Sequence, residues 1–248
     1  MRLIHFFLMQ APRAALCLWV LIASVIVHAE NTIDAPQPRL SGTQSEPAQP
    51  QNNRILKIIP AYGVVKDPNT PFHPLASRDK FVLFLHGAAD PYNFLVAGTV
   101  AGVEQAADIF PGYGQGAKGY GKRFGASLAD QASNSLFKNF AFPVLLREDP
   151  RYFRKDRGTF IQRSSYAVSR VFVTRRDSGR STFNWSGALG SLTSSGLANS
   201  YYPDSDRGPG ATFTRVGIAF GTDAALNVFS EFGPDLARKL LPHKAHKP

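Results

Sequence analysis

The chain contains almost no cysteine or methionine, and its acidic residues are outnumbered by basic ones. Its 248 residues include one Cys and two Met. A single cysteine excludes a disulfide-stabilised scaffold. Lys and Arg number 28 against 18 Asp and Glu, giving a net charge of +10, which excludes an acidic tail protein. Hydrophobic residues make up 44% and charged residues 19%, so most of the chain is expected to be globular.

The first 29 residues are typical of a signal peptide. Arg2 and Arg13 precede an apolar run over residues 14–27. That run suits the hydrophobic region of a signal peptide and is short for a membrane span. We expect cleavage after Ala29, with a retained anchor as the alternative. The predicted location is therefore the periplasm or another part of the cell envelope.

Cleavage at this site would change the composition of the exported chain. It removes the only cysteine, Cys17, and one of the two tryptophans, leaving Trp185. Two basic and no acidic residues are lost, which lowers the net charge from +10 to +8. A protein exported to an oxidising compartment without cysteine must be held together by its core alone.

Composition divides the rest of the chain into four segments. Residues 30–53 are rich in Pro, Gln, Ser and Asn without an apolar period, which predicts a flexible polar tether. Residues 54–76 predict an extended, Pro-rich segment. A helical domain is expected over 77–242, followed by a basic tail at 243–248.

Helix start and stop signals recur through the predicted domain, and no segment shows sustained alternation of apolar and polar residues. Asp90 and Pro91 are the clearest start signal, with Asp as the N-cap and Pro at the first helical position. We predict an all-α fold, a compact bundle of six to seven helices rich in small residues. The expected helices span about 77–87, 90–108, 118–140, 159–174, 185–200 and 211–232, with a last short one opened by Pro234.

Small residues spaced four apart suggest close helix packing. Ala97 and Ala101 form one such pair, and Gly98 and Gly102 form another. The pattern also occurs in membrane-embedded helix pairs. No segment after residue 29 has eighteen apolar residues in a row, however, so packing in a soluble or peripheral bundle is favoured.

A glycine-rich loop over residues 111–123 contains G-x-G-x-x-G and G-x-x-x-x-G-K patterns. A nucleotide-binding loop needs a preceding strand, and a phosphate loop needs Ser or Thr after its Lys. Here a helix is expected before the loop, and Arg123 follows Lys122. We therefore interpret the loop as a connector whose glycines permit close packing.

Polar residues also follow one stripe of the helix after this loop, from Arg123 through Asp130 to Asn134. A solvated stripe is one interpretation, and a buried polar line facing other helices is the other. On the second interpretation, Arg123, Asp130, Arg215 and Asp223 would face the interior and satisfy one another.

Basic residues are concentrated in the segment 147–180, which contains ten Lys or Arg and four Asp or Glu. Nine of the ten are Arg, whose planar fork suits phosphate and carboxylate. The alternative is that these arginines form ion pairs that anchor loops and bind no ligand. The candidate anion-binding residues are Arg147, Asp149, Arg151, Arg154, Arg175, Asp177, Arg180, Arg215 and Asp223.

The expected partners follow from export and from the catalytic motifs that are missing. An exported basic protein is expected to meet anionic lipid headgroups, phosphorylated envelope glycans or a protein partner rather than nucleic acid. The sequence has no H-E-x-x-H, no G-x-S-x-G and no metal-ligand spacing, so no metal or other cofactor is expected. A non-catalytic binding protein is therefore favoured over an enzyme, although the sequence leaves this open.

Three segments, in order, resemble the phosphatidic acid phosphatase superfamily. They begin at Arg147-Glu148-Asp149-Pro150, Asn184-Trp185-Ser186-Gly187 and Thr214-Arg215, within about residues 138–232. That all-helical family carries Lys-x6-Arg-Pro, Pro-Ser-Gly-His and Ser-Arg-x5-His-x3-Asp. Arg215 matches the Arg of the third motif, and Ser186-Gly187 match the middle of the second.

The chain departs from this family at its reactive positions. Ala188 replaces the second-motif His, Gly221 replaces the nucleophilic His and Ala225 replaces the Asp, while Lys138 and Arg147 are nine apart instead of seven. The resemblance therefore implies a phosphate-binding shell without its nucleophile. A divergent phosphatase-like hydrolase is the alternative function. More broadly, the chain resembles exported bacterial envelope proteins, a resemblance that implies no activity.

Overall fold

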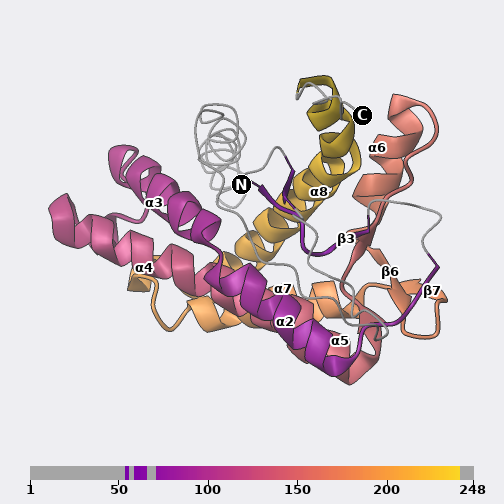
Figure 1. Ribbon diagram of the computed structural model, residues 1–248. Helices are drawn as coiled ribbons and strands as arrows, with labels where there is room; N and C mark the ends of the chain where they lie inside the picture. Colours follow the sequence, from indigo (N-terminus) through magenta and orange to yellow (C-terminus); the bar gives the residue numbers. More distant parts are fainter. Residues whose placement is uncertain (1–53, 56–58, 66–70, 241–248) are drawn as a thin grey trace, which may run out of the picture.

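The computed structural model describes residues 54–55, 59–65 and 71–240 (Figure 1). The predicted signal peptide, polar tether and basic tail lie outside the described residues. The described part is mostly helical, as the sequence predicts. Its α-helices are α2 (Ser77–Ala89), α3 (Pro91–Ala106), α4 (Gly116–Ser135), α5 (Phe142–Leu146), α6 (Phe160–Ser169), α7 (Trp185–Ala198) and α8 (Pro209–Leu240). The 3-10 helices are η1 (Pro111–Tyr113) and η3 (Asp204–Asp206), and the π-helix is η2 (Leu136–Ala141).

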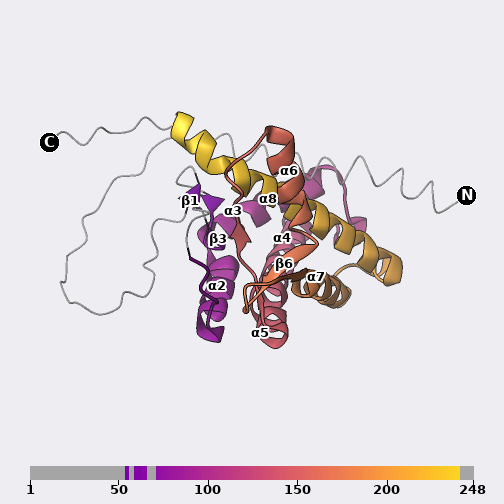
Figure 2. The ribbon, with the colours of Figure 1, turned by 90° about the vertical axis from the view of Figure 1, so that its right-hand side faces the viewer.

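The helices pack around one long path formed by α4, η2 and α5. Alongside it, α3 packs on α4, and α2 packs on α4 and η2. α7 contacts α4, η2 and α8, and α6 packs on α8. Figure 1 shows α8 crossing the direction of α4, with α6 beside its C-terminal half. In Figure 2, β6 and α7 lie below α8.

Short strands join the helices, which the sequence analysis did not predict. β1 (Arg54–Ile55) pairs antiparallel with β2 (Ile59–Pro60), and β3 (Val64–Val65) pairs parallel with β5 (Tyr152–Phe153). A three-stranded antiparallel sheet has the order β4-β6-β7, formed by Glu148–Asp149, Val173–Arg176 and Ser181–Phe183. Because each strand is only two to four residues long, none carries the alternation that would identify it.

Two helix starts agree with their sequence signals. Asp90 is the N-cap of α3, and its Oδ1 accepts a hydrogen bond from the Tyr92 amide at 2.8 Å, with Pro91 opening the helix. The Thr159 hydroxyl caps α6, and the Gln162 side chain bonds back to the Thr159 amide, forming a capping box. Local capping chemistry of this kind is readable from the sequence.

Two predicted helix ends at prolines are wrong. The helix expected to stop at Pro143 continues to Leu146, after a π-helical turn over Leu136–Ala141. A proline removes one helical hydrogen bond, and the wider π turn before it accommodates that loss. Likewise α8 runs through Pro234, which was expected to start a separate helix. Arg154 and Arg163 donate to the Glu231 carbonyl, three residues before this proline.

A third correction concerns the helix expected over 159–174. α6 ends at Ser169, and Val173–Arg176 form the central strand of the three-stranded sheet. Because its partners lie at Glu148–Asp149 and Ser181–Phe183, this strand depends on pairing that the local sequence does not show.

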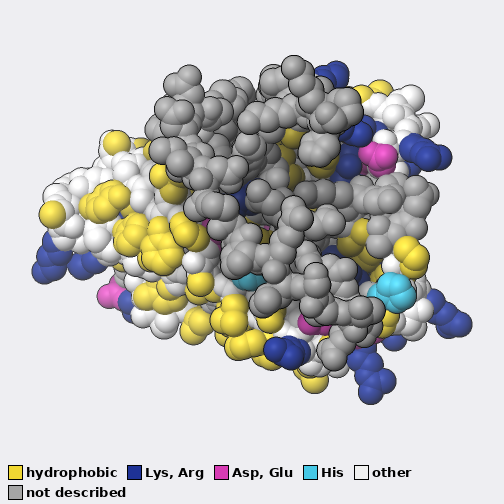
Figure 3. Space-filling view, in the orientation of Figure 1, with side chains coloured by type: hydrophobic (Ala, Val, Ile, Leu, Met, Phe, Trp, Pro, Cys, Tyr) yellow, Lys and Arg dark blue, Asp and Glu magenta, His cyan; other side chains and the backbone are white. Residues whose placement is uncertain are grey.

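Much of the interior is polar. The side chains of Lys80, Arg123, Glu148, Asp149 and Glu231 are all buried, whereas the larger hydrophobic cluster consists of Tyr113, Ala126, Ala198 and Tyr202. Many large apolar side chains are instead exposed, and Figure 3 shows hydrophobic side chains over α3 and α4. A compact bundle with an apolar centre describes this molecule only in part.

Small residues do allow close packing where α3 meets α4. Ala97 and Ala101 are fully buried on α3, and a Cβ on Gly98 would lie 3.2 Å from the Tyr120 hydroxyl of α4. A Cβ on Gly102, by contrast, would meet no atom within 4 Å. Within the described ranges, no helix has the length and hydropathy needed to cross a membrane.

Candidate functional site

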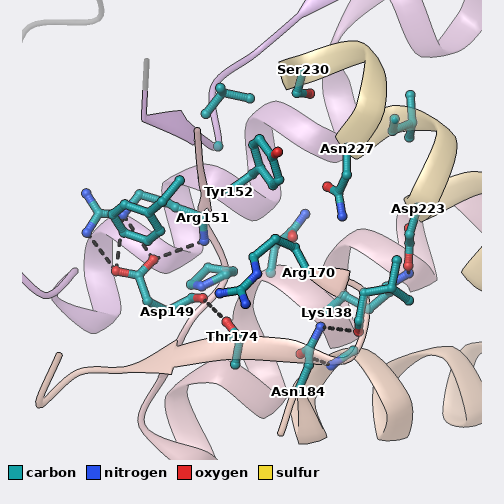
Figure 4. Close-up of a pocket in the computed structure, with 18 of the residues that line it drawn as sticks. Lys138, Asp149, Arg151, Tyr152, Arg170, Thr174, Asn184, Asp223, Asn227 and Ser230 are labelled. Carbon is teal, nitrogen blue, oxygen red and sulfur yellow. Dashed lines mark hydrogen bonds and ion pairs between the residues drawn. The ribbon is translucent and has the colours of Figure 1, made fainter. Parts of the chain in front are cut away.

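A cavity of about 390 Å³ lies where residues 60–64, the three-stranded sheet and α8 meet (Figure 4). The segment 60–64 and α2 form one wall, and β4, β5 and β6 form another. The C-terminal end of α6, the first turn of α7 and the middle of α8 complete it. Elements distant in sequence therefore all contribute side chains to this space.

Two ion pairs line the cavity. Lys138 Nζ of η2 lies 2.5 Å from Asp223 Oδ2 of α8. The Arg151 guanidinium binds both carboxylate oxygens of the buried Asp149, with Nη2 at 2.6 Å from Oδ2, and also donates to the His73 carbonyl. These four charges are matched within the protein, so they shape the cavity without supplying a free charge.

Two further arginines, Arg170 and Arg175, line the same cavity and are not matched. In the described part of the chain, neither has a carboxylate within ion-pair distance or a hydrogen bond from its guanidinium. The Nε of Arg170 is buried and lacks a hydrogen-bond partner there. A buried donor left unsatisfied normally costs about 1–3 kcal/mol.

Aromatic rings hold both guanidinium groups in place. The guanidinium carbon of Arg170 lies 4.7 Å from the centroid of the Tyr166 ring, and that of Arg175 lies 4.5 Å from the centroid of the Phe153 ring. Arg175 also lies over Phe72. Stacking on a ring leaves the N–H donors at the edge of the guanidinium free to bind an anion.

The remaining lining suits a polar ligand. Four basic and two acidic side chains line the cavity, a net charge of +2. Asn227 and Ser230 add an amide and a hydroxyl group, and Figure 4 shows Asn227 pointing from α8 into the cavity. The side-chain amide of Asn184 donates to the Val171 carbonyl and accepts from the Gly187 amide, so this residue fixes the turn between β7 and α7 beside Arg170. The arrangement can bind an anion and orient its polar substituents.

A second cluster contains arginines that are bonded to acidic residues of the protein. We call it the Glu231 network, formed by Tyr152, Arg154, Arg163, Glu231 and Asp235. Glu231 accepts from Arg163 Nε at 2.9 Å, from the Tyr152 hydroxyl at 2.9 Å and from the amides of residues 155 and 156. Arg154 is buried and bonds the Glu231 carbonyl.

The pKa of Glu231 reflects these partners. Burial alone would raise the pKa, but hydrogen bonds from Arg163 and from the two amides outweigh it and lower the pKa from 4.5. The pKa of Asp235 is also lowered, because burial, which would raise it, is outweighed by hydrogen bonds from Arg163 and Arg238. The network therefore matches the loop-anchoring alternative predicted for the arginine-rich segment.

The nine predicted site residues do not form one site. Asp149, Arg151, Arg175 and Asp223 line the cavity, and Arg154 belongs to the Glu231 network. The remaining four, Arg147, Asp177, Arg180 and Arg215, are not among the residues that line the cavity.

Asp177 instead pairs with the buried Lys80 of α2 at 2.8 Å. Arg147 and Arg180 are exposed. These residues were predicted to form one site because they are close in sequence, but they lie in different surroundings in the fold.

Arg215 lies apart from the residues that the phosphatase resemblance would place beside it. It donates to Asn199 Oδ1 at 3.1 Å and lies over the Tyr202 ring, both after the C-terminal end of α7. Ser186 stands at the other end of α7, a helix about 20 Å long, and binds Glu148 through its amide and hydroxyl. These motif positions do not combine into a single phosphate-binding shell.

The proposed mutual pairing of the polar stripes is also wrong. Arg123 is fully buried, as one interpretation required, but it donates to the carbonyls of Ile109, Phe110 and Gly114 and to the Gln105 side chain. Arg123 thus fixes the backbone at the start of the glycine-rich loop. Asp130 accepts instead from the hydroxyls of two tyrosines, Tyr201 at 2.5 Å and Tyr202 at 2.7 Å.

Several cavity residues were not predicted from the sequence. Arg170, Lys138, Asn184 and Asn227 were not proposed as ligand-binding residues. For Arg170 a signal existed, since all its neighbours from Ala167 to Val173 except Ser169 are apolar and none is acidic. The two asparagines carry no comparable signal, because their place in the cavity depends on how α7 and α8 pack.

Within the described ranges, no group of three His, Cys, Asp or Glu side chains could hold a metal ion. Comparisons with protein-family models, with curated proteins and with solved structures find no match to this chain. The geometry of the cavity is therefore the basis for a functional proposal.

Proposed function

We propose that this protein binds an anionic ligand, one bearing a phosphate or carboxylate group, in the cavity between the sheet and α8, without catalysing a reaction on it. The observation that carries the proposal is the pair Arg170 and Arg175, whose guanidinium groups line the cavity without a carboxylate partner in the described chain. Export, predicted from the N-terminal sequence, would make the ligand a component of the cell envelope.

Three features support binding over simple structural use of these arginines. The cavity has a net charge of +2, which favours an anion. Aromatic stacking orients both guanidinium groups before the ligand arrives, which reduces the ordering cost of binding. Elsewhere in the same segment the fold supplies acids for Arg151, Arg154 and Arg163.

Isothermal titration with inorganic phosphate tests the proposal. We expect wild-type protein to bind phosphate at low salt. The double variant R170Q/R175Q should bind at least about tenfold more weakly, because a hydrogen bond to a charged group contributes roughly 1.5–3 kcal/mol.

The matched control is Arg176→Gln. Arg176 follows Arg175 on the same strand but is exposed and does not line the cavity. This variant should bind phosphate like wild type. Equal binding by R170Q/R175Q, or equal loss in the control, would show that the cavity arginines are not the binding site.

A further inference from the structure

Four large apolar side chains are exposed beside the cavity. The exposed fractions are 47% for Phe172, 44% for Phe183, 51% for Trp185 and 52% for Leu226. We call these four residues the apolar rim. Single exposed apolar residues are ordinary on protein surfaces, but a group of them next to a binding site indicates an apolar contact.

Strand register and direct lining connect half of the rim to the cavity. Leu226 is itself a lining residue. Phe183 is opposite Val173 in the antiparallel pairing of β6 with β7, so the two side chains share one face of the sheet. Val173 lines the cavity. Phe183 therefore stands on the cavity side of the sheet.

Ring contacts place the other two rim residues. The Trp185 ring packs against Phe183 with centroids 4.9 Å apart. Phe172 packs against Phe220 of α8, with centroids 5.8 Å apart. Phe220 precedes Asp223, a lining residue, by about one helical turn. The rim thus extends from the β6–β7 hairpin to α8 around the anion site.

Cations lie beside the rim. Arg175 shares the cavity face of β6 with Val173, and therefore with Phe183, and Arg170 lines the same cavity. Exposed aromatic residues beside Lys or Arg are typical of surfaces that lie at a membrane interface, where rings reach the acyl boundary and cations meet anionic headgroups.

We propose that the ligand is an anionic phospholipid in a membrane surface. Its phosphate would bind Arg170 and Arg175, and the apolar rim would lie against the glycerol and upper acyl region. This inference rests on the proposed anion-binding function and names its ligand class. A soluble phosphate or a phosphorylated glycan would leave the four rim side chains in water, whereas a phospholipid would bury them. The contact needs no membrane-spanning helix, because the rim reaches only the interface.

Tryptophan fluorescence provides a direct test. Trp185 is the only tryptophan of the chain cleaved after Ala29, so in that form it is the only emitter. On vesicles of phosphatidylglycerol with brominated acyl chains, we expect a blue shift and quenching of Trp185. Phosphatidylcholine vesicles should give neither. In the same background, R170Q/R175Q should weaken vesicle binding roughly thirtyfold. Each cation near an anionic surface strengthens binding about fivefold, and this variant removes two.

Rim variants separate insertion from headgroup binding. F183S/L226S should lose the quenching of Trp185 while still binding inorganic phosphate. Ile161→Ser is the matched control, since Ile161 is 75% exposed on the first turn of α6, at the opposite end of that helix from Arg170. It should be quenched like the parent. If the double rim variant does not fold, the quenching of the chain with its native rim still decides the question.

The outcomes distinguish this inference from the function on which it rests. Phosphate binding without quenching of Trp185 would overturn the phospholipid and leave the anion site standing. Quenching that is unchanged in R170Q/R175Q would overturn the headgroup assignment. Failure of wild-type protein to bind phosphate would overturn the anion site itself.

Discussion

The Glu231 network and the cavity use arginine in opposite ways, although both draw on the same segment of chain. In the network, Arg163 bonds Glu231 and Asp235, each within 3 Å. In the cavity, Arg170 has only an aromatic ring beneath it and a buried Nε without a partner. The two arginines are seven residues apart: Arg163 lies within α6, and Arg170 is the C-cap of the same helix. Arginine content alone therefore does not distinguish an anchoring arginine from a candidate ligand-binding one, and the proposal rests on the unmatched pair.

The largest effect should come from breaking the network. Glu231→Ala leaves the Nε of Arg163, the Tyr152 hydroxyl and two amides without their acceptor, so we expect a loss of about 3–5 kcal/mol in the free energy of unfolding. Urea denaturation monitored by circular dichroism measures it. A loss below about 1 kcal/mol would mean that the network is not a structural anchor.

The same network predicts a response to acid. The pKa of Glu231 is lowered from 4.5, so the folded protein keeps this group ionised where the unfolded chain takes up a proton. Its contribution to stability is complete above pH 4.5 and is lost as the pH falls through the folded-state pKa. In Glu231→Ala, this part of the acid dependence should disappear.

A carboxylate without such donors should behave in the opposite way, which sharpens the comparison. Burial, with a smaller effect from Asp130, raises the pKa of Glu104 from 4.5 to about 7. The folded protein therefore holds a proton that the unfolded chain releases, and stability falls as the pH rises from 4.5 to about 7.

Glu104→Gln should remove that dependence and raise the free energy of unfolding at pH 8 by about 3 kcal/mol. Urea denaturation at pH 5 and pH 8 measures the difference between the two proteins. An equal free energy of unfolding for variant and parent at both pH values would contradict it.

Removing a cavity arginine should change the free energy of unfolding only slightly. We expect Arg170→Gln to change the free energy of unfolding by less than about 1 kcal/mol, because the lost stacking on Tyr166 is offset by removal of an unsatisfied buried donor. Thermal and urea denaturation without ligand measure it, with Arg163→Gln as the counterpart from the network. A loss in Arg170→Gln as large as that in Arg163→Gln would erase the distinction between the two regions.

The smallest effect is expected at an exposed ion pair. Arg207 and Asp204 lie 2.7 Å apart, but the Asp204 side chain is 92% exposed and that of Arg207 is 42% exposed. Asp204→Ala should change stability by no more than about 0.5 kcal/mol. Urea denaturation in parallel with Glu231→Ala provides the comparison, and a large loss at Asp204 would show that ion-pair distance rather than burial sets the energy.

The predicted helices agree with the structure where local chemistry decides them. Asp90 with Pro91 and Thr159 with Gln162 are complete signals within a few residues, because a helix cap satisfies backbone donors next to it in sequence. Pro143 and Pro234 were misread for the complementary reason. Whether a helix continues past a proline depends on packing against distant elements, here that of η2 on α2 and α7 and that of α8 on α6 and α7.

For the candidate site, the sequence by itself determined the basic charge, its concentration over 147–180 and the dominance of arginine there. Only the tertiary structure decided which arginines are matched. The acids that neutralise Arg163 lie at positions 231 and 235, about seventy residues away, and reach it because α6 packs on α8. No acid from a distant element meets Arg170 in the described chain. Pairing across the fold, which depends on packing rather than on neighbouring residues, therefore separates the anchoring arginines from the free ones.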